Sequence, residues 1–451
     1  MKKFCLLFLL LATFLFNPLF VSAQSQDINI QRAAANRVLA NRYRPTLLKR
    51  FLKYVTYNSQ SSETEQITPN QIATAKKLYE EIKAMGHNVQ LTEHYYIFVE
   101  IPSNLPWQVP VLGFSGHYDV TPGIEGENVL SQVHYSYDGN AIQLAQNRVL
   151  DPAEPANAYL ATQKGKTIVT SDGNTILGAD DKAGVSILMT FLETLAQHPE
   201  KKHGPIQIVL APNEDVGRAA EFVEETPYRP EIAFDFDGGS NGRVIIENFN
   251  ARQEIFTVTG KPGHQSYAAT NGYKNSVLPT AVLVTNICQL ERLPDQSSDR
   301  QGYAEPHHIS HPDGKVYITE VDYRLRGYDA KKMNEWEYNT DSISRKVAEQ
   351  FNVSIQRRTI KNYSNVGECS HPQALQVTQN AGRHAEVELN IESARAGTTA
   401  AMFVTKGLVG AYTIFTGQNN PHAYTEWLSE EDMFKSYLMA LQLTDEVAGL
   451  R

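Results

Sequence analysis

The sequence is poor in cysteine, with only Cys5, Cys288 and Cys369 among 451 residues. Cys5 lies in an N-terminal segment that we expect to be removed, and the two cysteines that remain cannot form a disulfide framework. Neither of them has another cysteine at a spacing typical of a metal site. A metal bound by this chain would therefore use histidine and carboxylate ligands.

Long apolar runs are also scarce. The one at residues 4–16 follows Met1-Lys2-Lys3 and precedes Val21-Ser22-Ala23, a pattern that predicts a signal peptide over residues 1–23. The run is short for a bilayer span, and no later stretch reaches spanning length. We therefore expect an exported protein, periplasmic or secreted, with no membrane contact after cleavage. An uncleaved anchor is the alternative.

Positive charge is in deficit as well. The formal net charge is −9, and loss of the two signal-peptide lysines takes it to −11. An acidic chain is poorly suited to bind nucleic acid through its phosphates. The sequence contains no low-complexity run or fixed-period repeat, and its length suits about two to three domains.

Short apolar strands alternate with helical patterns along most of the chain, as at residues 109–114, 206–211 and 232–236. This alternation predicts an α/β domain with a largely parallel sheet flanked by helices, comprising residues 40–250 and 364–451. Residues 121–165 are polar and are expected to form a long surface excursion.

Within residues 251–363 the strands instead have one polar face. We therefore expect these residues to form an inserted α+β domain. His307, His308 and His311 lie in this part and are interpreted as solvated loop residues.

Two adjacent carboxylates, Asp180 and Asp181, stand between glycines in the stretch Ile176-Leu177-Gly178-Ala179-Asp180-Asp181-Lys182-Ala183-Gly184. A strand pattern precedes them and a helical pattern follows. Carboxylates at such a position either cap the helix or hold a cation. This stretch alone leaves both interpretations open.

Histidine and acidic residues follow each predicted strand of the α/β domain. They are His117, Asp119, Asp180, Glu214, Asp215, Asp237 and, near the end of the chain, His422 with Glu426. Each of these on its own would suit a surface turn. In open α/β sheets, however, sites are built at the carboxyl ends of strands, so the set indicates one site.

Two histidines and three carboxylates suit zinc, with manganese and cobalt as looser fits. A carboxylate shared by two cations can hold them about 3.5–4 Å apart, and a water between them would lose a proton near neutral pH. Of the adjacent residues Glu214 and Asp215, one could bind metal while the other acts as the general base. Asp119 could orient the ring of His117.

The chain resembles the peptidase T branch of the M20 metallopeptidase family, whose members are tripeptide aminopeptidases. The resemblance covers most of the chain after residue 23. Its most specific motif is the run of residues 170–184, and it extends to Gly116-His117-Tyr118-Asp119, Asn213-Glu214-Asp215, Asp237-Gly238-Gly239, Arg395-Ala396-Gly397-Thr398 and Phe415-Thr416-Gly417.

The resemblance implies a zinc-dependent aminopeptidase with two zinc ions per chain, and it assigns each site residue a role. Asp180 bridges the ions, His117 and Asp237 complete one site, and Asp215 and His422 complete the other. Glu214 is the general base and Asp119 orients His117. The inserted domain is a ferredoxin-like lid, in which His264 stabilises the oxyanion; Arg395 and Gly397 contact the substrate. Relatives of this kind also dimerise, which implies a homodimer.

Three features of this chain differ from the usual pattern of the family that it resembles. Asp215 stands where a glutamate is usual, Thr399 stands where an aspartate is usual, and the chain carries an export signal whereas the relatives are cytoplasmic. The leading hypothesis is removal of the N-terminal residue of short peptides, such as tripeptides. The alternatives are a dipeptidase, carboxypeptidase or N-acyl amino acid hydrolase, and a metal- or peptide-binding protein without turnover.

Overall fold

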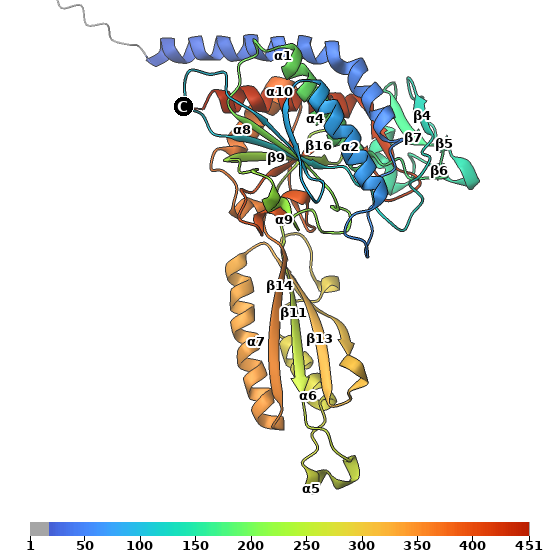
Figure 1. Ribbon diagram of the computed structural model, residues 1–451, viewed down its shortest axis with the longest axis vertical. Coiled ribbons are helices and arrows are strands. Elements are labelled where there is room, and N and C mark those ends of the chain that lie inside the picture. Colours follow the sequence, from blue (N-terminus) through green and yellow to red (C-terminus); the bar gives the residue numbers. More distant parts are fainter. Residues whose placement is uncertain (1–17, 451) are drawn as a thin grey trace, which may run out of the picture.

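The computed structural model describes residues 18–450, which form two bodies joined end to end (Figure 1). Most of the predicted signal peptide, residues 1–17, lies outside the described residues. Among the helices that are described, none combines the length and the apolar character needed to cross a membrane.

The larger body is built on a mixed sheet of eight strands. In order across the sheet, these are β1 (Asn88–Leu91), β2 (Ile97–Ile101), β8 (Ile206–Ala211), β3 (Leu112–His117), β9 (Ile232–Gly238), β16 (Tyr412–Phe415), β10 (Arg243–Asn248) and β15 (Asn390–Ala394). The four central strands, from β8 to β16, run parallel to one another. The predicted α/β class with a largely parallel sheet is therefore confirmed.

Helices cover one face of this sheet and separate it from solvent (Figure 1). They are α1 (Pro18–Tyr54), α2 (Pro69–Ala84), α4 (Ala179–Gln197), α8 (Ala374–Ala385) and α10 (Glu430–Ala448). α4 lies between the sheet and the outer helices α1 and α10, which explains why it is buried on nearly every side. The short helix α9 (Thr399–Val404) lies on the opposite face, towards the second body.

Residues 121–165 are more ordered than the sequence suggested. They contain β4 (Ser131–His134), β5 (Ile142–Gln143), β6 (Val149–Leu150) and the short helix α3 (Ala158–Ala161). β4 joins an antiparallel sheet with β7 (Ile168–Ser171), β18 (Trp427–Ser429) and β17 (Gln418–Asn419). The strand before Asp180, which we expected to be part of the central layer, is β7 of this sheet. Pairing of β7 with β18 brings the segment that precedes Asp180 beside the one that follows His422.

The second body is the predicted lid. It runs through β11 (Asn250–Thr259), α6 (Val277–Ile287), β12 (Tyr303–Ser310), β13 (Ile318–Gly327), α7 (Ala330–Phe351) and β14 (Ser354–Tyr363). The sheet order β12-β13-β11-β14, with both helices packed on one face, makes it ferredoxin-like, as expected. The loop interpretation of His307 and His308 is wrong, because both lie on β12. Pro306 concealed this strand, since proline fits a sheet only at an edge such as β12 provides.

Candidate metal centre and active site

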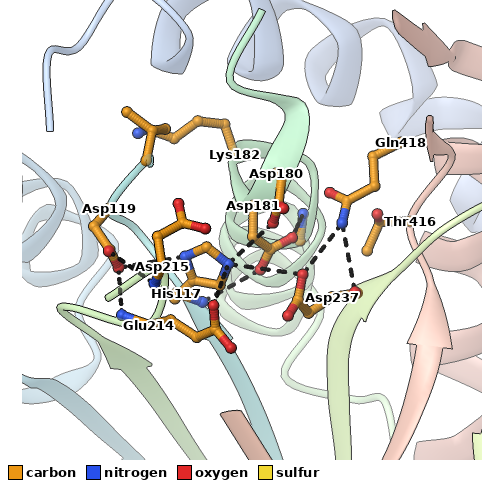
Figure 2. A network of polar contacts seen from close by, with 12 residues as sticks. His117, Asp119, Asp180, Asp181, Lys182, Glu214, Asp215, Asp237, Thr416 and Gln418 are labelled. Atoms are coloured by element: carbon orange, nitrogen blue, oxygen red, sulfur yellow. Dashed lines mark hydrogen bonds and ion pairs between the residues drawn. The ribbon is translucent and has the colours of Figure 1, made fainter. Parts of the chain in front are cut away.

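The carboxyl ends of three neighbouring parallel strands meet at the site. His117 is the last residue of β3, Asp237 lies at the end of β9, and Glu214 and Asp215 follow β8. Figure 2 shows the His117 ring between these side chains, with Asp119 on one side and Asp237 on the other. His117 and Asp119 are completely buried, so the site lies within the protein rather than on its surface.

The two adjacent aspartates point in different directions. The Asp180–Asp181 peptide is cis, and both residues have non-helical backbone angles, so the regular part of α4 begins after them. One carboxylate oxygen of Asp181 accepts the Gly184 amide at 2.9 Å, and the other accepts the His117 amide at 3.2 Å. Asp181 therefore caps α4 and ties it to β3. Asp180 is left to face the site.

The Asp180 carboxylate lies between two histidine rings. Its Oδ1 is 3.1 Å from His117 Nε2, and its Oδ2 is 3.3 Å from His422 Nε2. Asp237 Oδ1 lies 3.7 Å from His117 Nε2, whereas Asp215 Oδ1 lies 2.8 Å from His422 Nε2. These distances define two groups of possible metal ligands, one with His117, Asp180 and Asp237 and the other with Asp180, Asp215 and His422. The ligand atoms of each group lie within 4.8 Å of one another, and Asp180 belongs to both groups.

The residues present fit a pair of divalent cations. Histidine nitrogen and carboxylate oxygen are suitable zinc ligands, and the buried Asp215 Oδ2 has no hydrogen-bond partner in the described chain. Burial, reinforced by the negative Asp180, raises the pKa of Asp237 to about 8. Burial also raises the pKa of Asp215 to about 6, against the opposing effect of its hydrogen bond with His422. Bound cations would compensate the negative charges of these neighbouring carboxylates.

Asp119 connects the acidic pair to the buried histidine. Its carboxylate accepts the backbone amides of Glu214 at 3.0 Å and Asp215 at 3.2 Å. The same carboxylate lies 3.3 Å from His117 Nδ1, the ring nitrogen that faces away from Asp180. A third candidate ligand group is formed by His117, Asp119 and Asp215. Asp119 can thus orient His117 and fix the loop after β8 at the same time.

Glu214 lies beside the ligands but belongs to none of the three groups. Its Oε2 is 3.8 Å from His117 Nε2, and its side chain lines a cavity of about 640 Å³ between the catalytic body and the lid. Burial raises the pKa of the Glu214 carboxyl well above its ordinary value. A carboxylate next to the metal ligands and open to a cavity has the position that a general base requires.

Two further residues support the site, although the sequence analysis assigned neither of them a role. Glu426 is buried and accepts the amides of Gly178 at 2.7 Å and Asp180 at 3.0 Å, which fixes the loop that presents Asp180. Lys182 is also buried, and its ammonium donates to the Tyr118 carbonyl at 2.8 Å and to Ser59 Oγ. Both stand within or next to the predicted motifs, but only the fold shows what they contact.

Two predicted residues are not brought to the site within one chain. His264 is exposed and precedes α5 (Ala268–Asn271), which lies at the end of the lid farthest from the catalytic body (Figure 1). The Arg395 guanidinium donates to Ser297 Oγ and to the carbonyls of Asp299 and Gln301, so it holds a lid loop. Gly397, by contrast, lines the cavity beside Glu214.

The two positions at which this chain departs from the usual family residue, Asp215 and Thr399, have different surroundings. Asp215 reaches His422 despite its shorter side chain, at 2.8 Å. Thr399 is completely buried at the start of α9, so it does not face the cavity as a recognition residue would.

Comparison with known proteins places these features in a family. Residues 169–445 match the model for peptidase family M20/M25/M40. Peptidase T of Listeria innocua is 34% identical over 413 residues, which are 90% of this chain and 98% of that protein. Peptidase T of Clostridium acetobutylicum is 31% identical over 88% of this chain and 98% of its own length.

Solved structures share the fold. The aminopeptidase PepT of Bacillus cereus superimposes with a TM-score of 0.67 at 16% identity, over 90% of this chain and 99% of that one. A dinuclear metal binding peptidase of the M20 family from Bacillus subtilis gives a TM-score of 0.61 at 10% identity, with the same coverage. Both likenesses support the two-body architecture described above.

The shared position of Asp180 leads to a prediction about metal content. Asp180→Asn should lose both zinc ions after zinc reconstitution, because its carboxylate belongs to both ligand groups. Asp237→Asn should lose only one. Elemental analysis of the purified proteins measures this, with the exposed lid residue Asp313→Asn as the control that retains both. Equal zinc content in the Asp180 and Asp237 variants would contradict a shared ligand.

Proposed function

The chain belongs to peptidase family M20/M25/M40, and on that premise we propose that it is a di-zinc aminopeptidase that removes the N-terminal residue of short peptides, above all tripeptides. The observation that carries this proposal is the pair of ligand groups that share Asp180, with Glu214 beside them at the mouth of a cavity. Similarity to peptidase T over nearly the whole chain supports the choice of substrate.

The site would hold one zinc ion with His117, Asp180 and Asp237 and the other with Asp180, Asp215 and His422. When bound, such ions supply Lewis acidity towards the peptide carbonyl and lower the pKa of a water molecule. Glu214 takes a proton from the attacking water and passes it to the leaving amine. Glu426 and Asp181 keep the Asp180 loop in place while this happens.

A panel of short peptides tests the proposed reaction. Zinc-loaded protein should hydrolyse free tripeptides faster than dipeptides, and it should release the N-terminal amino acid first, as mass spectrometry of the products would show. Preference for N-acylated substrates would instead favour an acyl amino acid hydrolase. Release of the C-terminal residue would favour a carboxypeptidase.

The general base is tested by Glu214→Gln, which keeps the shape of the side chain but cannot accept a proton. We expect kcat to fall by about 10²–10⁴-fold, the usual contribution of a general base, while the zinc content stays at the wild-type level. Glu63→Gln is the matched control, because Glu63 is exposed and makes no contribution to the site. Near wild-type turnover by Glu214→Gln would refute the assignment.

His264 needs a second copy of the chain if it is to act as an oxyanion donor, because it lies just before α5, at the end of the lid farthest from the metal site. A homodimer is supported by the exposed apolar residues Val277 and Leu278 on α6 and by the open edge of β12. Light scattering should give twice the chain mass. Mixing inactive Glu214→Gln with inactive His264→Ala should restore part of the activity, whereas an active monomer would exclude this arrangement.

Export rests on the N-terminal sequence alone. If the predicted cleavage occurs, intact mass and N-terminal sequencing of protein recovered from the producing cells should identify Gln24 as the first residue. The protein should then fractionate outside the cytoplasm. Recovery of the uncleaved chain in the cytoplasm would overturn this part of the proposal.

A further inference from the structure

The cavity beside Glu214 has a positively charged wall. Its volume of about 640 Å³ falls within the range of small-ligand sites, about 300–1,000 Å³. One side is formed by Glu214, Val216 and Gly217 of the catalytic body. The other side belongs to the lid and includes Arg324, Arg326 and Lys361.

The lid strands carry these cations towards the catalytic body. Arg324 and Arg326 lie near the end of β13, and Lys361 lies near the end of β14, on the other side of β11. Figure 1 shows these strand ends directed at the catalytic body, beneath α9. The cations are therefore presented to whatever extends from the site into the cavity.

Two of the three cations have no partner within the described residues. Arg324 and Lys361 are exposed to the cavity and form no side-chain hydrogen bond or ion pair there. Arg326 is held in place, because its guanidinium donates to the carbonyls of Arg252 and Leu325 and lies 5.6 Å from the Tyr363 ring centroid. The wall thus presents one fixed and two free positive charges.

The wall has more positive charges than a peptide with neutral side chains has negative ones. A tripeptide with neutral side chains carries a single negative charge, at its terminal carboxylate. Three cations on one wall can hold at least one more carboxylate, and charge-assisted hydrogen bonds from arginine or lysine are stronger than neutral ones.

We propose that the lid cations Arg324 and Lys361 select peptides with an acidic side chain after the cleaved bond. This inference rests on the proposed function, and it names the substrate class of that same site. The peptide would lie with its cleaved bond beside Glu214 and its acidic end against the lid.

The test compares Ala-Ala-Glu with Ala-Ala-Gln, two substrates of the same shape that differ by one charge. Wild-type protein should favour the glutamate peptide in kcat/KM by about tenfold, the order expected for one charge-assisted hydrogen bond. The double variant Arg324→Gln and Lys361→Gln should reduce this preference to nearly none. Salt should weaken the wild-type preference, because the cations are exposed and therefore screened.

A matched control uses Arg358, another exposed cation of β14, which does not line the cavity. Arg358→Gln should keep the wild-type preference. Equal kcat/KM for both peptides in the wild type, or a preference that survives the double substitution, would overturn the proposal.

A binding measurement separates this proposal from the proposed reaction. Calorimetry on zinc-loaded Glu214→Gln should give a lower Kd for Ala-Ala-Glu than for Ala-Ala-Gln, and the difference should vanish when Arg324 and Lys361 are also replaced. This result would support acidic-peptide recognition even if the chain hydrolysed no peptide. Equal Kd values would overturn it even if tripeptides were hydrolysed.

Discussion

The contact of Asp180 with two histidine rings is the feature on which the rest of the site depends. The oxygens of one carboxylate lie 3.1 Å from His117 and 3.3 Å from His422, although these histidines are about 300 residues apart in the sequence. So short an acidic side chain can meet both rings only if its backbone is held firmly. Hydrogen bonds to Glu426 and the cap made by Asp181 provide that support.

The carboxylates of the site are unfavourably placed unless cations are present. Glu426 is buried, Asp237 and Asp215 are largely buried, and burial raises the pKa of each above its ordinary value. Gathering several carboxylates in a volume from which water is excluded is unfavourable unless positive charge compensates them. The arrangement is therefore one that a pair of divalent ions would stabilise, and the family relation is consistent with this chemistry.

Much of the architecture could be predicted from the sequence, and the failures have physical reasons. The strands β3, β8 and β9 are rich in apolar residues, because they are buried on both faces, so their positions were evident. β12 was missed because it is an edge strand that tolerates Pro306 and polar histidines. The short strands of residues 121–165 were missed because they lie among polar residues, and β4 pairs with a strand outside this segment, β7.

By itself the sequence determined which residue types follow the central strands, and parallel strands end at a common edge, so the grouping of His117, Asp215 and Asp237 was predictable. Asp180 follows β7 of the second sheet, so its place beside them was decided by the tertiary structure. The sequence could not determine which way a side chain turns. Asp180 faces the site while Asp181 caps α4, and this difference depends on where the regular part of α4 begins. Arg395 binds a lid loop, and this contact depends on how the two bodies meet. The position of His264 and the cationic wall were likewise decided only by the tertiary structure, because both depend on how the lid sheet is directed relative to the catalytic body.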